Sequence, residues 1–446
     1  MSLPAPTTFA GRLAQLGPGL IISAAIVGSG ELIVVPKLGA ATGFALLWFL
    51  VLGCVLKVFV QIELARHAIA HQETTLVSLD TLPGPRWRIS WALWAWLVMY
   101  GGTVLQVGGI IGGITMICGM LGLAWPPWVW LALTTGSGIL LLVSGRYAPV
   151  ERYATVMVAV FTLSTMVAVV ALQWTEFQVT PAQLREGLWP SNVAGFTLAF
   201  AAFGVTGVGA SELIYYPYWC LEKGYGRNVG PPPEGGAWSA ERAGWIARAR
   251  GWLRVMRLDA FVSMIIYTLA TIAFYLLGAA VLHRTARDAG DNELIGRLAD
   301  MYLRSLGEWS HTLFLIGAFA VLYSTFFVAT ASNARLLVDI GGLLGVPAAA
   351  AQTADARRRA IRFGCVLLPL ASATAFIVWP QPVTLVLIGA VGQGLMLPVL
   401  AGAAVYFRHR RLPPDLAPSL PWTIALWTSA LLIALVGAYQ LYNAVR

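Results

Sequence analysis

The chain has 446 residues, of which 58% are hydrophobic and only 11% are charged. A water-soluble domain usually carries about 25% charged residues, so a soluble fold of this composition would lack a polar surface. The net charge of +9 comes from basic residues that lie in the gaps between apolar runs, which argues against nucleic acid as a partner. The composition therefore predicts an integral membrane protein.

Apolar runs long enough to cross a hydrocarbon core about 30 Å thick recur along the whole chain. They predict eleven membrane-spanning helices, at residues 18–38, 43–68, 91–120, 126–145, 151–174, 192–220, 257–282, 310–334, 360–380, 382–407 and 421–443. With a cytoplasmic N-terminus, the inner connections hold 21 of the 29 Lys and Arg residues and the outer connections hold seven. This bias predicts a cytoplasmic N-terminus and an outer C-terminus, because basic residues stay on the cytoplasmic side.

The connection before the seventh span is the longest predicted inner segment. Residues 237–254 place Trp238, Trp245 and Trp252 on one side of a helix and arginines on the other. This pattern predicts a cytoplasmic interfacial helix on the membrane surface, and the alternative is a solvated basic linker. Scarce lysine and the absence of an Asn-x-Ser/Thr acceptor favour a bacterial inner (plasma) membrane.

The most informative pattern is a ten-residue segment that occurs twice, 181 residues apart. Val27–Pro36 and Val208–Pro217 are identical at six of the ten positions, and both contain Gly-x-x-Glu-Leu-Ile. The copies lie in the first and sixth predicted spans, so they cross the membrane in opposite directions. Inverted repeats of this kind are typical of secondary transporters, whose substrate site lies near the midplane on discontinuous helices. We therefore expect a single transporter domain over 1–446, with five-helix repeats at 18–174 and 192–407 and an extra eleventh helix at 421–443.

Each copy places a carboxylate in a weakened stretch of helix. A carboxylate within a span costs several kcal/mol unless it is paired, protonated or bound to something. Glu31 and Glu212 are therefore the leading candidates for binding a substrate or a metal ion. The alternative is that each Glu only caps the broken helix of its own half. The other candidates for substrate or ion binding in these segments are Val27, Gly28, Ser29, Val208, Gly209 and Ser211.

Polar side chains in other spans are candidates for coupling or for lining a pocket. Lys57 either faces the two glutamates or extends its ammonium group to the lipid headgroups. Ser324 and Thr325 either line an ion site or form hydrogen bonds between helices. Less specific candidates are Tyr100, Gln106 and Gln393. The sequence has no Walker loop, no paired metal-binding His and no nucleophile motif, so we expect neither an enzyme nor a cofactor.

Several short motifs occur in a characteristic order: Gly17-Pro18-Gly19 before the first span, Gln61 and Leu64-Ala65-Arg66 in the second, and Leu397-Pro398 in the tenth. In this order the whole chain, 1–446, resembles the natural resistance-associated macrophage protein (Nramp) family of divalent-metal transporters. The resemblance implies an all-α membrane protein with the LeuT-type fold. That fold has a five-plus-five inverted repeat, broken first and sixth helices, and here one extra helix.

The chain departs from the family at the residues that bind metal. The family's Asp-Pro-Gly-Asn in the first break aligns with Gly28-Ser29-Gly30-Glu31. Its Met-Pro-His-Asn in the sixth span aligns with Gly209-Ala210-Ser211-Glu212, or with Ser211 at the Met, and its ligand Gln in the tenth span falls at Ala390. Loss of the thioether and of the direct carboxylate argues against an ordinary transition-metal site. The remaining oxygens, with space left by glycine, suit a hard or partly hydrated divalent ion such as magnesium or manganese, or an organic ammonium group.

Three hypotheses follow from these residues. The first is a secondary transporter of a divalent cation, with or without proton symport. The second is a carrier of a small organic substrate, an amine or amino acid, in a pocket enlarged around Gly28 and Gly209, with sodium near Ser324 and Thr325. The third is a sensor or assembly protein that transports nothing. The expected partners are the transported cation or small solute and the lipid bilayer. The sequence leaves the oligomeric state undetermined and is compatible with a monomer.

Overall fold

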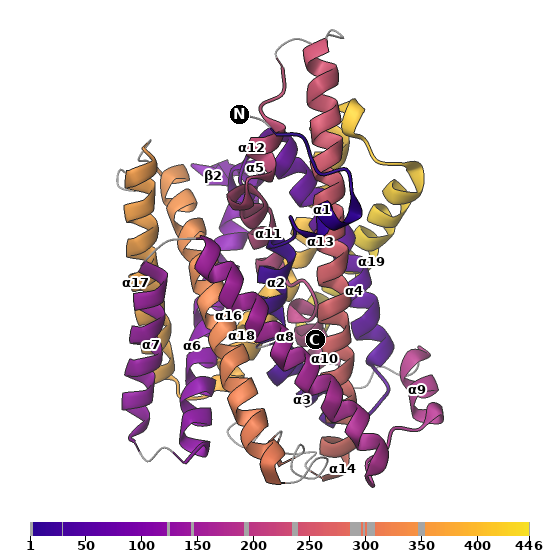
Figure 1. The fold of residues 1–446 in the computed structure, drawn as a ribbon, viewed down its shortest axis with the longest axis vertical. Coiled ribbons are helices and arrows are strands. Elements are labelled where there is room, and N and C mark those ends of the chain that lie inside the picture. The colour runs from indigo at the N-terminus through magenta and orange to yellow at the C-terminus, as the bar shows by residue number, and fades with distance from the viewer. Residues whose placement is uncertain are drawn as a thin grey trace.

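The structure is a computed structural model that describes residues 3–28, 30–122, 125–143, 147–190, 196–233, 240–285, 296–297, 299–300, 308–346 and 353–445. Helices account for most of it, with one two-stranded antiparallel hairpin (Figure 1). The elements in the first part of the chain are α1 (Phe9–Leu13), α2 (Pro18–Ile26), η1 (Gly30–Val34), α3 (Val35–Thr42), α4 (Leu47–His71), α5 (Thr75–Asp80), β1 (Arg86–Trp87), β2 (Ile89–Ser90), α6 (Trp91–Met120), α7 (Pro127–Val143), α8 (Tyr147–Ala171), η2 (Leu172–Trp174) and α9 (Pro181–Leu188). Those in the second part are α10 (Phe196–Val205), α11 (Ala210–Lys223), α12 (Tyr225–Val229), α13 (Ala240–Leu277), η3 (Gly278–Leu282), α14 (His283–Thr285), α16 (Glu308–Leu343), α17 (Ala354–Val378), α18 (Pro382–Arg410), η4 (Pro414–Leu416) and α19 (Leu420–Val445).

Each of the eleven predicted spans coincides with helix. In the described part of the chain, nine helical stretches are long and apolar enough to cross a membrane. Two shorter apolar stretches, Pro127–Val143 and Ala159–Trp174, lie at the predicted fourth and fifth spans. The first and sixth spans each consist of two helical pieces, α2 with α3 and α10 with α11.

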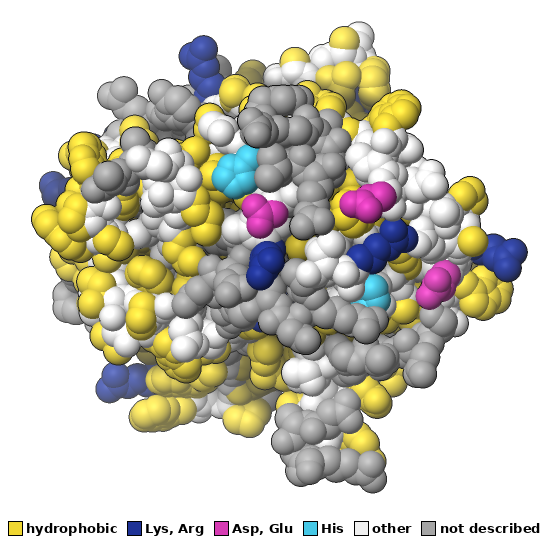
Figure 2. Space-filling model, turned by 90° about the horizontal axis from the view of Figure 1, so that it is seen from below, with side chains coloured by type: hydrophobic (Ala, Val, Ile, Leu, Met, Phe, Trp, Pro, Cys, Tyr) yellow, Lys and Arg dark blue, Asp and Glu magenta, His cyan; other side chains and the backbone are white. Residues whose placement is uncertain are grey.

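The outer surface of the bundle carries apolar side chains that water would not stabilise. Leu140, Val160, Phe363 and Leu431, on α7, α8, α17 and α19, are each more than half exposed. Viewed from the end opposite the N-terminus, hydrophobic side chains cover much of the rim (Figure 2). A belt of this kind fits hydrocarbon, so the chain is an integral membrane protein.

The broken first span lies inside the bundle. Its helix α2 contacts α8, α11, α13 and α16, and most of its residues are buried. Around this centre, α6 and α18 form the most extensive contact between two described helices, and α17 packs beside α6. The surrounding helices therefore bury the α2 half of the broken first span.

Residues 240–254 do not form a separate surface helix as expected. They continue directly into the seventh span as part of α13, which projects beyond the neighbouring helices (Figure 1). The buried indole N–H groups of Trp245 and Trp252 donate to the carbonyl oxygens of Gly230 and Leu3. Trp238 lies outside the described residues. The tryptophans therefore pack against the chain's own segments, because two stretches distant in sequence return to cover them.

Candidate functional site

The first span is interrupted where the sequence predicted it. Helix α2 ends at Ile26, and a π-helical turn, η1, begins at Gly30 and leads into α3. Ser29, one of the candidate binding residues, lies outside the described residues. A π-helical turn widens the backbone and is frequent at functional sites.

The sixth span is interrupted between Val205 and Ala210. Gly207 has a φ of +58°, a left-handed conformation that favours glycine. Gly209 is the N-cap of α11 and has extended backbone. Because residues 206–209 are not helical, several of their peptide groups need partners from elsewhere in the protein.

Glu31 provides one of these partners. Its side chain is fully buried, and Oε1 accepts hydrogen bonds from the Gly207 N–H at 3.1 Å and the Thr271 hydroxyl at 2.9 Å. Among the residues that the structure describes, its Oε2 has no hydrogen-bond partner. Glu31 therefore caps the break of the opposite repeat, not that of its own half. Sequence reasoning missed Thr271, because a single Thr in an apolar span is common and carries no signal.

Lys57 provides hydrogen bonds to the carbonyl groups on the N-terminal side of the sixth-span break. Its ammonium group is fully buried and donates to the carbonyl oxygens of Phe203, at 2.7 Å, and Thr206. These carbonyls lie at the C-terminal end of α10, where the helix dipole favours a cation. Within the described part of the chain, Lys57 forms no ion pair with Glu31 or Glu212, although its charge acts on both carboxylates. The alternative that Lys57 extends to the headgroups is wrong.

Glu212 lies on the opposite side of the sixth-span break, at the third position of α11. It is 9% exposed, and no side chain or backbone group in the described part of the chain hydrogen-bonds its Oε2. A methyl group added at Gly209 would lie 2.6 Å from Glu212 Oε2, 2.5 Å from Gln393 Oε1 and 2.9 Å from the Gly204 carbonyl oxygen. Three oxygens therefore gather around one glycine. The third helical position also suits capping of α11.

Gln393, on α18, brings an amide oxygen to the break of the sixth span. The resemblance to the family placed the corresponding Gln at Ala390, where the side chain has no oxygen. Its Oε1 accepts from the Ser211 N–H at 3.0 Å, and its Nε2 donates to Gln106 Oε1 at 2.8 Å. Ala390 lies one turn earlier on α18, with its carbonyl against Gly204. The placement of the family's Gln at Ala390 stays a prediction, and the next turn of the helix brings another amide oxygen, that of Gln393, to the break.

The expected enlargement of the pocket at Gly28 is also wrong. A methyl group there would lie 1.6 Å from Thr325 Oγ1, so the Thr325 side chain already fills the space. That hydroxyl donates to the Ala24 carbonyl at 3.0 Å, whereas the buried hydroxyl of the neighbouring Ser324 has no partner among the described residues. The side chain of Thr325, on α16, thus occupies the space that a side chain at position 28 would need.

The remaining candidate residues pack in the core or form hydrogen bonds between helices. Val27 and Val208 are fully buried in the hydrophobic core. The Tyr100 hydroxyl donates to the Asn333 carbonyl at 3.1 Å, which ties α6 to α16. Within the described residues, no group of three or more His, Cys, Asp or Glu side chains comes together. The carboxylates available at the two breaks are therefore Glu31 and Glu212.

An all-α bundle whose first and sixth spans are discontinuous has the fold of LeuT-type secondary transporters. The chain belongs to the Nramp family, because the family model described as natural resistance-associated macrophage protein-like matches residues 19–443. No curated protein sequence matches the chain.

Solved structures support the fold. The chain is similar to a point mutant of the Eremococcus coleocola manganese transporter, with a TM-score of 0.72 and 13% identity over 99% of this chain and 88% of that chain. It is similar to MhsT in complex with L-phenylalanine, with a TM-score of 0.55 and 16% identity over 94% and 98% of the two chains. It is also similar to Mhp1, a nucleobase-cation-symport-1 family transporter, with a TM-score of 0.52 and 14% identity over 98% and 91%.

Proposed function

We propose that this protein is a secondary transporter that moves a hard divalent cation, Mg²⁺ or Mn²⁺, through the site between Glu31 and Glu212. One observation carries the proposal: each of these buried carboxylates, at the breaks of the first and sixth spans, keeps an oxygen that no described residue hydrogen-bonds. Family membership and the similarity to a protein described as a manganese transporter support it.

The donor set favours a hard ion. Glu212 Oε2, Gln393 Oε1 and the Gly204 carbonyl oxygen adjoin the same glycine, and the alignment places no thioether there. Oxygen ligands suit Mg²⁺ and Mn²⁺, and Mg²⁺ keeps several of its waters. Lys57 offsets part of the negative charge of the two carboxylates, so the site holds a divalent ion less tightly than two carboxylates alone. Weaker binding favours release on the far side.

Proton coupling is part of the proposal. A carboxylate buried without a partner is costly in its charged form, so a proton or a cation is expected to occupy Glu31 or Glu212. The two then compete for the same oxygens. Such competition would couple the movement of the cation to the movement of protons.

The direction of the chain in the membrane follows from its charges. We place the N-terminal face in the cytoplasm and the C-terminus outside, in a bacterial inner membrane, because the basic residues gather on the N-terminal side. The halves at 18–174 and 192–407 would then move against each other around the site. The C-terminal helix α19 lies outside this pair.

The experiment is uptake of Mg²⁺ and Mn²⁺ into proteoliposomes under an imposed cation or proton gradient. Glu31→Gln and Glu212→Gln should each abolish uptake while the purified protein stays monodisperse. Glu186→Gln, the same change at an exposed site on α9, is the matched control and should leave uptake unchanged.

Three outcomes would contradict the proposal. Wild-type uptake by both glutamate variants would remove these residues from the mechanism. Sodium-dependent uptake of an amine or amino acid, without divalent-cation flux, would favour the organic carrier. Binding of a ligand without flux under every gradient would favour a sensor.

A further inference from the structure

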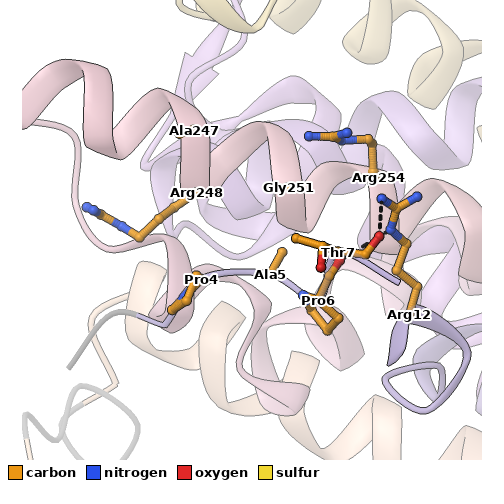
Figure 3. Close-up of a pocket in the computed structure, with 9 residues that line it drawn as sticks. All are labelled: Pro4, Ala5, Pro6, Thr7, Arg12, Ala247, Arg248, Gly251 and Arg254. Atoms are coloured by element: carbon orange, nitrogen blue, oxygen red, sulfur yellow. Dashed lines mark hydrogen bonds between the residues drawn. The ribbon is translucent and has the colours of Figure 1, made fainter. Parts of the chain in front are cut away.

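A pocket lined by three arginines lies far from the transport site, on the face of the molecule that carries the N-terminus. It has a volume of about 320 Å³ and lies between the N-terminal segment and the first part of α13 (Figure 3). Its lining residues are Pro4, Ala5, Pro6, Thr7, Arg12, Ala247, Arg248, Gly251 and Arg254. Thr271, which contacts Glu31, lies 17 residues beyond Arg254 on the same helix, or roughly 25 Å at 1.5 Å per residue.

Hydrogen bonds and close packing hold the wall of this pocket in place. The Leu3 N–H donates to the Asn228 carbonyl at 3.1 Å, and the Trp252 indole donates to the Leu3 carbonyl at 2.9 Å. A methyl group at Gly251 would lie 2.8 Å from the Ala5 side chain, so the N-terminal segment packs directly on α13. The pocket is therefore a formed feature of the fold.

Three arginines give the pocket a positive charge that no carboxylate of the described residues neutralises. Their hydrogen bonds go to backbone carbonyls: Arg12 to Pro6 and Thr7, Arg248 to Val229, and Arg254 to Arg250. Arg242, by contrast, is paired with Asp415 at 2.7 Å.

The three arginines lie at opposite ends of the pocket. In Figure 3, Arg248 lies at one end of the pocket and Arg12 and Arg254 lie at the other, with Pro4 to Thr7 between them. Three like charges without a counter-charge favour an anion.

We propose that this pocket binds a phosphate group. Guanidinium groups form paired, charge-assisted hydrogen bonds with phosphate oxygens. Within the described residues, Arg248 and Arg254 each donate only through Nε, which leaves their terminal nitrogens for such a ligand. The group can come from an anionic phospholipid or from a soluble phosphate ester. We favour the lipid as the source, because Phe9 and Leu13 on α1 are 64% and 41% exposed in the same short helix as Arg12. Exposed apolar residues next to arginine are typical of a segment at a bilayer surface.

The test is binding to the full-length purified protein, so its result is independent of cation transport. Delipidated protein is titrated with phosphatidylglycerol and with phosphatidylcholine, and bound lipid is counted by native mass spectrometry. Arg12→Gln combined with Arg254→Gln should weaken phosphatidylglycerol binding about tenfold. Arg358→Gln combined with Arg359→Gln removes the same charge from exposed positions on α17 and should change nothing.

Further arms separate the two sources of phosphate. If the source is lipid, Phe9→Ser combined with Leu13→Ser lowers phosphatidylglycerol binding, and inorganic phosphate does not displace the lipid. If the source is soluble, inorganic phosphate or glycerol 3-phosphate binds the wild type and not the Arg12→Gln, Arg254→Gln variant. Equal binding of every probe to the wild type and this variant, or no binding at all, would overturn the proposal.

Discussion

The contact between Gly28 and Thr325 offers a sharp test of how the first break packs against α16. A methyl group at Gly28 would lie 1.6 Å from Thr325 Oγ1 and 2.5 Å from its Cβ, whereas ordinary van der Waals contacts begin near 3.4 Å. Both residues are buried, so neither can move into solvent. Gly28→Ala should therefore destabilise the protein by about 1–3 kcal/mol, the usual cost of overpacking.

The assay is thermal unfolding of the purified protein in detergent, followed by intrinsic fluorescence. Thr325→Gly removes the atoms that clash, so combining it with Gly28→Ala should restore much of the loss. The coupling energy of the pair should be about 1–3 kcal/mol, although a glycine in α16 itself costs about 1 kcal/mol. Gly136→Ala on α7 is the matched control, because a methyl group there meets nothing within 4 Å.

Two results would refute this reasoning. A Gly28→Ala variant that unfolds at the wild-type temperature would mean that Thr325 does not fill the space beside Gly28. A destabilised variant that Thr325→Gly fails to rescue would place the clash elsewhere on the first span.

Two further predictions concern the ends of the broken helices. The Asp259 carboxylate accepts from the N–H groups of Gly17 at 2.9 Å and Gly19 at 2.6 Å. Asp259→Ala should therefore uncap α2 and lower the free energy of unfolding by about 1–2 kcal/mol, read from the unfolding midpoint in detergent. Gln393→Leu removes an oxygen beside Gly209 and leaves the Ser211 N–H without its acceptor, so cation uptake should fall about tenfold. Unchanged initial uptake rates in proteoliposomes would exclude Gln393 from the site.

The sequence alone determined the plan of this protein. Eleven apolar runs predicted the nine spanning stretches and the two shorter apolar helices of the described residues, because a bilayer demands a minimum length of apolar helix wherever the chain crosses it. The repeated Gly-x-x-Glu-Leu-Ile predicted both breaks, since glycine and a buried acid are local features of the chain. The sequence also shows that Gly28 and Gly209 stand where the family has metal ligands. Such a difference is read from residue identity alone and requires no knowledge of packing.

Only the tertiary structure decided what surrounds those acids. Thr325 fills the space at Gly28, Gln393 brings an amide oxygen to Gly209, and Thr271 donates to Glu31. Each of these partners comes from a helix that is distant in the sequence. Which turn of a helix faces a given neighbour depends on how the helices pack together, and local composition carries no record of that packing. The same physical reason explains α13, whose tryptophans are covered by segments that return from elsewhere in the chain.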